Sequence, residues 1–122
     1  MKTGDLITKP WGWERILDLN DYYCVKHLFV KKGHRLSLQY HERKRETMVL
    51  VSGGAELTRG PRDGATQAID MVTGEPYVIE PGTVHRLRGT AEEGALVLEV
   101  STPEVDDLVR LEDDYGRQGQ RP

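Results

Sequence analysis

Glycine and proline interrupt this sequence at short intervals, which disfavours long helices over most of its length. The interruptions have the composition of turns and fall at residues 32–33, 52–54, 60–64, 73–74 and 81–82. Between them lie short runs in which valine, isoleucine and tyrosine recur, as is typical of strands. The runs cover residues 13–17, 22–30, 36–41, 47–52, 55–59, 67–71, 76–79, 84–88 and 95–101. So many short strands in 122 residues predict an all-β closed barrel or jelly roll, not an open sheet.

The last part of the chain has a different pattern. Residues 105–111 have apolar spacing that suits a short turn or helix, and we expect one there. From Gly116 onward the sequence is polar, so we expect residues 117–122 to form a frayed tail. A chain of 122 residues suits one domain and is short for two, which predicts a single domain over residues 1–122.

Composition limits the classes of partner. The 17 basic and 20 acidic residues nearly balance, which argues against a nucleic-acid partner. No apolar run approaches the length of about 20 residues that spans a bilayer, so we expect no membrane partner. The residues after Met1 do not resemble a signal peptide, and the single cysteine, Cys24, excludes an intrachain disulfide. We therefore expect a cytoplasmic protein in which Cys24 is a buried apolar residue.

Four side chains with metal-ligand chemistry have informative spacings: Gln39, His41, Glu46 and His85. Gln39 and His41 are two residues apart, so on a strand they point to the same face. Glu46 follows a four-residue bend, and His85 follows the Pro81-Gly82 turn. Imidazole and carboxylate ligands suit Zn, Fe, Ni, Co or Mn. With Glu46 as the only anionic ligand, a divalent ion would keep a charge of about +1 and act as a Lewis acid.

These four residues lie in a wider glycine frame that resembles the two motifs of the cupin family. The first is Gly33, five residues, Gln39, one residue, His41, four residues, Glu46, six residues and Gly53. Glutamine stands here where many cupins have the first histidine. The second is Gly74, five residues, Glu80-Pro81-Gly82, two residues and His85, with Glu80 at the usual proline position and Gly89 at the usual asparagine position. The resemblance implies a cupin double-stranded β-helix, a jelly-roll barrel, with the four residues as metal ligands.

Within the cupins, the sequence resembles type II mannose-6-phosphate isomerases (phosphomannose isomerases) over roughly residues 8–117. The similar segments are 9–14, 33–41, 98–101 and 109–117. Glutamine in place of the first histidine is that family's own ligand pattern. The family's domain usually follows a mannose-1-phosphate guanylyltransferase domain, so we expect this chain to be a free-standing version. Where the family has Arg-x-Glu-His-Trp, this chain has Lys44 for arginine, Arg45 for a small residue, and Thr47-Met48 for His-Trp.

The resemblance implies interconversion of mannose 6-phosphate and fructose 6-phosphate through an enediol, with zinc as the expected metal and Mn, Ni, Co or Fe as alternatives. The sequence does not single out the catalytic base. A phosphate group needs basic partners. Arg35 has the strand parity of Gln39 and His41, and Lys44 lies in the bend beside the ligands, so both are predicted substrate contacts. Arg86 has the opposite parity to His85 and is expected to point outward.

Two other functions fit the same residues. One is another metal-dependent cupin enzyme such as an oxygenase, although the Gln39 carbonyl is an unusual ligand for one. The other is a non-catalytic cupin that binds a sugar or a metal. A homodimer formed through the outer sheet is expected by family analogy, with Leu36, Leu38 and Tyr40 pointing outward. The acidic pair 106–107 is expected to be solvated.

Overall fold

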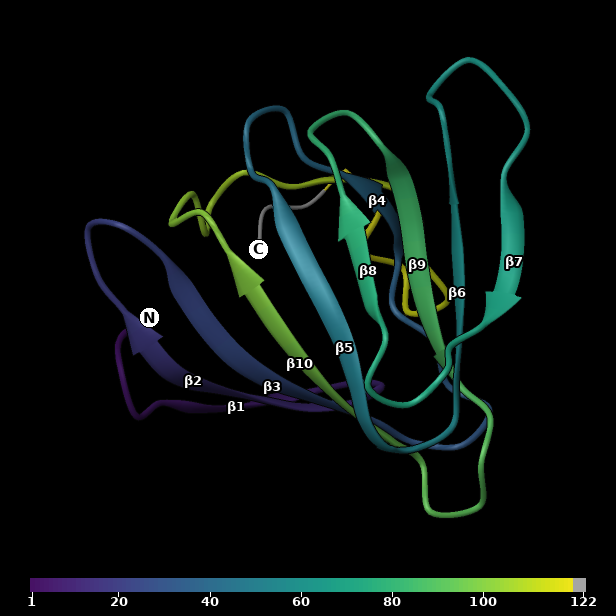
Figure 1. Cartoon of the computed structure of the whole chain (residues 1–122). Helices are drawn as coiled ribbons and strands as arrows, with labels where there is room; N and C mark the ends of the chain where they lie inside the picture. Colours follow the sequence, from purple (N-terminus) through teal and green to yellow (C-terminus); the bar gives the residue numbers. More distant parts are fainter. Residues whose placement is uncertain (120–122) are drawn as a thin grey trace.

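Two antiparallel β-sheets face each other in the computed structural model, which describes residues 1–119 (Figure 1). The six-stranded sheet has the order β1-β2-β3-β10-β5-β8, and the five-stranded sheet has the order β11-β4-β9-β6-β7. The strands of the first are β1 (Leu6–Lys9), β2 (Gly12–Leu19), β3 (Cys24–Val30), β10 (Ala95–Ser101), β5 (Glu46–Gly53) and β8 (Pro76–Ile79). Those of the second are β11 (Val109–Glu112), β4 (Leu38–Tyr40), β9 (Val84–Gly89), β6 (Ala55–Gly60) and β7 (Gln67–Asp70).

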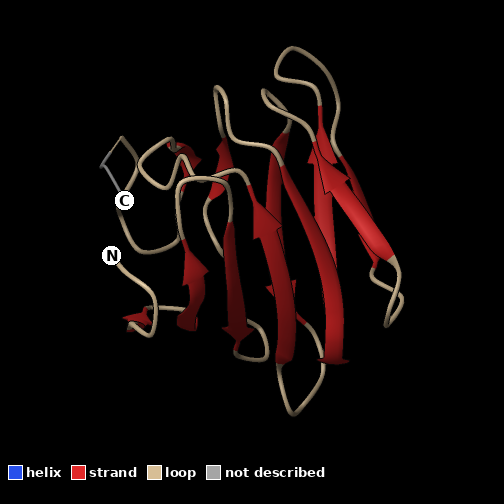
Figure 2. Cartoon of the chain, turned by 60° about the vertical axis from the view of Figure 1, so that its left-hand side comes forward, coloured by secondary structure: helices blue, strands red, loops and turns tan. Residues whose placement is uncertain are grey.

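The described residues form strands and loops but no helix (Figure 2), so the all-β prediction is confirmed. Each predicted run contains a strand, but β1 and β11 were not predicted. A turn does form at residues 105–106. The helix expected as its alternative is wrong for residues 109–111, because they lie in β11, which pairs with β4 and places Arg110 opposite Gln39. Within residues 1–119 no helix has the length and apolar character needed to cross a membrane.

The core lies between the sheets and follows from strand alternation. In β3, every second residue from Cys24 to Val30 is buried, and the other sheet contributes Leu57 and Leu87, which are almost completely buried. These side chains belong to one apolar cluster with Leu28. Full burial of each such aliphatic side chain stabilises the fold by about 1.5–3 kcal/mol.

One stretch breaks the alternation and changes two predictions. Leu36 and Ser37 are consecutive, yet both are buried, and regular strand structure starts only at Leu38. Leu36 is therefore part of the core and does not point outward. Tyr40 is also buried, because the Arg62 guanidinium lies 4.1 Å from the centre of its ring. The outward direction expected for Leu36 at a dimer contact is thus wrong, while the outward direction of Leu38 and the homodimer itself stay predictions.

The chain end is attached to the body as far as it is described. Arg117 donates hydrogen bonds to Asp113 from its backbone N–H and from its side chain, and the Gly119 N–H donates to the Arg110 carbonyl at 3.4 Å. Residues 117 and 119 therefore contact the body of the protein, and fraying of the tail stays a prediction. The remainder of the expected tail, residues 120–122, lies outside the described residues.

Candidate metal centre

Three of the predicted ligands meet between the two sheets. His41 directly follows β4, Glu46 opens β5, and His85 lies in β9. Their ligand atoms all lie within 4.8 Å of one another, and the side chains are almost completely buried. Gln39 lies directly opposite His85 in the β4–β9 pair and accepts a hydrogen bond of 2.7 Å from the Ser37 hydroxyl. A His/Glu/His group that could hold a metal ion is thus present.

Hydrogen bonds to backbone carbonyls orient both imidazoles. His41 Nδ1 lies 2.6 Å from the Asp107 carbonyl oxygen, and His85 Nδ1 lies 2.9 Å from that of Thr83. A carbonyl oxygen only accepts, so both Nδ1 atoms carry the proton and donate it. Both Nε2 atoms then turn to one carboxylate oxygen, Glu46 Oε1, at 3.3 Å and 2.8 Å. Two imidazole lone pairs and a carboxylate converge on one point, which is the arrangement of a metal site.

The electrostatics of this group also suit a cation. Burial opposes the ionisation of Glu46, but hydrogen bonds from His41 and His85 hold its pKa well below the usual range. Burial likewise opposes a charge on His85, but the Glu46 carboxylate raises its pKa. Without an ion, protons on Nε2 must separate these acceptors. Because metal ligands must be deprotonated, a metal cation would take the place of those protons.

Two loops hold the ligands in place. Gly82 has a φ of +83°, a left-handed conformation that glycine adopts readily, and its N–H donates to the His41 carbonyl at 2.7 Å. This bond joins the turn before His85 to the end of β4. On the other side, the Asp107 carboxylate accepts three backbone N–H groups, from Glu42, Arg43 and Lys44, at 2.7–2.9 Å. The expectation that Asp107 is merely solvated is therefore wrong, because it fixes the bend between His41 and Glu46.

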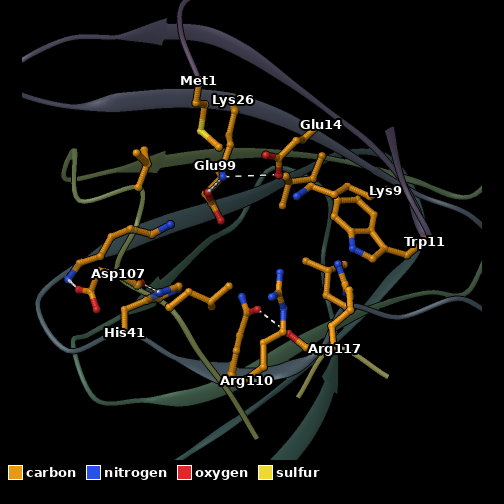
Figure 3. Close-up of a pocket in the computed structure, with 17 residues that line it drawn as sticks. Met1, Lys9, Trp11, Glu14, Lys26, His41, Glu99, Asp107, Arg110 and Arg117 are labelled. Atoms are coloured by element: carbon orange, nitrogen blue, oxygen red, sulfur yellow. Dashed lines mark hydrogen bonds and ion pairs between the residues drawn. The ribbon is translucent and has the colours of Figure 1, made fainter. Parts of the chain in front are cut away.

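A pocket lined by Gln39 and His41 opens beside this group (Figure 3). Its wall carries a buried charged cluster that the sequence analysis missed: Lys26 Nζ lies 3.6 Å from Glu14 and 3.4 Å from Glu99. Burial would lower the pKa of Lys26, but Glu99 and Glu14 raise it. Burial and the charge of Glu46 raise the pKa of Glu99 to about 7.

Strand parity could have revealed this cluster. Lys26 alternates with Cys24 and Leu28 on β3, so it shares their inward face. The same rule places Glu99 between the buried residues Val97 and Ser101 of β10.

The two predicted substrate contacts lie in different places. Lys44 is buried, lines the pocket, and has its Nζ 3.7 Å from Glu46 Oε2. Arg35 does not share the inner face, because the consecutive inward residues after it reverse its parity. It makes two hydrogen bonds to Asp114, at 2.7 Å and 2.8 Å, and lines an outer hollow with Arg86 and Arg88. The outward direction expected for Arg86 is confirmed.

The sequence is similar to a known family and to several curated proteins. The family model described as mannose-6-phosphate isomerase C-terminal matches residues 1–113. The xanthan biosynthesis protein XanB of Xanthomonas campestris is 34% identical over 114 residues, which cover 91% of this chain and 23% of XanB. The alginate biosynthesis protein AlgA of Pseudomonas aeruginosa is 32% identical over 117 residues (93% and 23%). A mannose-1-phosphate guanylyltransferase of Escherichia coli is 35% identical over 114 residues (91% and 23%). The chain thus spans about a quarter of the length of these relatives.

Solved structures agree on the fold. The capsular polysaccharide assembling protein CapF of Staphylococcus aureus superposes with a TM-score of 0.78 at 19% identity, covering 88% of this chain and 34% of CapF. Oxalate decarboxylase of Bacillus subtilis gives a TM-score of 0.76 at 20% identity (88% and 30%). KdgF of Halomonas sp. gives 0.68 at 19% identity (84% and 88%). At this identity they show the fold alone, which is that of a cupin, so the predicted jelly roll is confirmed.

Proposed function

Because this chain belongs to the family of mannose-6-phosphate isomerase C-terminal domains, we propose that it is a metal-dependent sugar-phosphate isomerase that interconverts mannose 6-phosphate and fructose 6-phosphate. The observation that carries the proposal is the convergence of two imidazole Nε2 atoms on Glu46 Oε1 at the side of a pocket. Three buried acceptors that face one another stabilise a fold less than apolar side chains of similar size would. A bound cation would account for their convergence.

The proposed metal ligands are Gln39, His41, Glu46 and His85, with zinc as the proposed ion. Gln39 lines the pocket from the strand next to His85, and its carbonyl would complete a four-ligand set. When bound, the ion would polarise the substrate oxygens and stabilise the negative charge of an enediolate. The chain's own groups must orient the sugar and move the proton.

Lys44 and Lys26 suit the orientation of the sugar. Both line the pocket, and their ammonium groups have three donors each for sugar oxygens. Lys26 is held in its charged form by Glu14 and Glu99, so it serves as a donor and not as a base. A base in the pocket must move the proton from one carbon of the sugar to the next. Since Lys26 is charged and does not act as a base, the carboxyl groups of Glu14 and Glu99 are the candidates.

A coupled assay that detects fructose 6-phosphate formed from mannose 6-phosphate tests the function, together with elemental analysis of the purified protein. We expect about one zinc per chain and turnover that stops when a chelator removes it. His41→Ala should lose metal and turnover together. His27→Ala is the matched control, because His27 is only half-buried and lies outside the site.

Each alternative has its own outcome. Bound metal without turnover of mannose 6-phosphate would favour the non-catalytic sugar- or metal-binding cupin. Bound iron with oxygen consumption would favour the oxygenase. Full activity in metal-free protein would contradict the proposed mechanism.

A further inference from the structure

The outer face of the six-stranded sheet is apolar over several strands. Figure 1 shows β2, β3, β10 and β5 of this sheet side by side. In β3, β10 and the first part of β5, every second residue is buried, and the residues between them point outward. The outward residues are Val25, His27, Phe29, Leu96, Leu98, Val100, Thr47, Val49 and Val51. Seven of these nine are apolar, whereas the solvated face of an antiparallel sheet is normally polar.

Strand register joins these side chains into one continuous surface. Leu98 lies opposite His27 on one side and opposite Val49 on the other, and side chains in such positions touch. On β2, Trp13 lies opposite Phe29, and their rings stack with centres 5.6 Å apart. We call this surface the outer patch, and its apolar residues are Trp13, Val25, Phe29, Leu96, Leu98, Val100, Val49, Val51 and Val78.

The outer patch is also almost free of charge. None of the 20 acidic residues of the chain occupies an outward position of β3, β10 or the first part of β5. A single arginine borders the patch, because Arg15 of β2 lies opposite His27. By contrast, three arginines and two carboxylates line the outer hollow of the five-stranded sheet. The apolar character therefore belongs to one face of the molecule.

The outer patch is large enough for a stable contact. Val51 and Val100 are 44% and 41% exposed, so water reaches apolar side chains across it. The patch crosses five strands, or about 24 Å, and extends over about five residues, or about 17 Å, along them. The resulting area of about 400 Å² is typical of the largest apolar patches of monomers, which are often functional. Two such faces bury about 800 Å² before their rims are counted, close to the roughly 1,000 Å² of a specific interface.

A second copy of the chain matches this face in charge and in shape. The outward positions of β3, β10 and β5 hold no carboxylate and no lysine, so the patch offers nothing that would select a charged partner. Two sheets can pack face to face with interdigitating side chains, and a face that meets itself closes as a two-fold dimer. We propose that the protein forms a homodimer in which the outer patches of two copies pack against each other.

This contact differs in place from the one expected from the sequence, because Leu38 belongs to the other sheet. It does not rest on the proposed function. Glu99, which lines the pocket, points inward between the outward residues Leu98 and Val100. The dimer therefore covers one face of these strands and leaves the pocket on the other face open.

Light scattering after size-exclusion chromatography measures the mass of the whole chain at several concentrations. We expect a wild-type mass of about twice the 13.8 kDa of one chain. Val100→Glu should weaken the dimer about a hundredfold or more, because it puts an unpaired charge into the contact. Val72→Glu is the matched control, because Val72 is an exposed valine between β7 and β8, outside the patch. Both variants should keep the circular dichroism and the metal content of the wild type.

Hydroxyl-radical footprinting of the wild-type protein needs no variant. Phe29 and Leu98 should be oxidised less as the protein concentration rises and dimers form. Leu111 is the internal control, because it is exposed on β11 of the other sheet, and its oxidation should not change.

Each other outcome contradicts the homodimer through this face. A wild-type protein that is monomeric at about 100 μM would overturn it. A dimer that Val100→Glu and Val72→Glu weaken equally, or one in which Phe29 and Leu98 stay as reactive as in the monomer, would place the contact elsewhere. Protection of a monomer only after addition of the mannose-1-phosphate guanylyltransferase of Escherichia coli would assign the patch to a different partner. None of these measurements depends on turnover, so failure of the proposed function would leave them unchanged.

Discussion

Replacement of Asp107 by alanine should destabilise the protein and weaken metal binding at the same time. The carboxylate accepts three backbone N–H groups at 2.7–2.9 Å. Hydrogen bonds to a charged group contribute about 1.5–3 kcal/mol each when buried. Asp107 is half-buried, and water can reach the released N–H groups, so we discount each to below 1 kcal/mol. The expected loss is about 2 kcal/mol in the free energy of unfolding.

The metal effect follows from the position of the bend. The 42–44 segment joins His41 to Glu46, and the Asp107 carbonyl also accepts the His41 Nδ1 proton at 2.6 Å. Alanine keeps that carbonyl but releases the segment, so the orientation of both ligands becomes less defined. Loss of such an outer contact typically weakens metal binding about tenfold or more.

Urea unfolding and zinc titration of the purified variant measure the two effects separately. A loss of about 2 kcal/mol should lower the melting temperature of a domain of this size by about 8 °C. Asp106→Ala is the matched control, because Asp106 is the exposed neighbour of Asp107. If Asp107→Ala and Asp106→Ala unfold at the same urea concentration and bind zinc equally, the hydrogen bonds between Asp107 and the 42–44 bend have no energetic role and the reasoning is refuted.

Three further predictions test other parts of the molecule. The pKa of His85 is raised above 6.5, so its stabilising proton is fully bound below that pH and is lost as the pH rises through the raised value. A metal competes with this proton for His85 Nε2. Zinc affinity, measured with a competing chelator, should therefore fall about tenfold per pH unit below the raised pKa for each proton displaced. A zinc affinity that does not change with pH would contradict Nε2 as a ligand. Lys44→Gln should lower kcat/KM for mannose 6-phosphate at least about tenfold, while Arg35→Gln should change it less than about twofold, and the reverse order would restore the parity prediction. Leu57→Ala should cost about 3 kcal/mol in urea unfolding, because Leu57 is completely buried, whereas the exposed control Val51→Ala should cost less than about 0.5 kcal/mol; similar values for both would contradict the assigned core.

The sequence was sufficient for the fold class and for the meeting of three metal-ligand side chains. Strand periodicity is a local property, and the breaks between the runs are turn residues, so the strands could be located without the fold. Spacing placed only Gln39 and His41 on one face, and the resemblance of the glycine frame to the two cupin motifs supplied Glu46 and His85. The two missed strands are only four residues long each. In β11, the apolar spacing of the preceding loop concealed the strand, and only its pairing with β4 decides the conformation.

The substrate side of the pocket was harder to predict, for a physical reason. Alternation assigns a face only while the strand is regular, and two inward residues in succession, Leu36 and Ser37, reversed it for Arg35. Asp107 was missed for a different reason: its partners are backbone N–H groups of a segment more than sixty residues away. Such a contact leaves no pattern in the local sequence.

Four residues near Glu46 differ from the family pattern, but most of them lie away from the pocket. Glu46 and Met48 lie on the same face of β5, and Met48 packs in the apolar core. Arg45 pairs with Glu80 at the surface, at 3.0 Å. Lys44 alone among the four replaced positions lines the pocket. Lysine keeps the positive charge of the family's arginine but loses its planar fork, which binds two oxygens at once. If the substrate differs from that of the relatives, the difference should therefore lie in how this one cation meets the sugar.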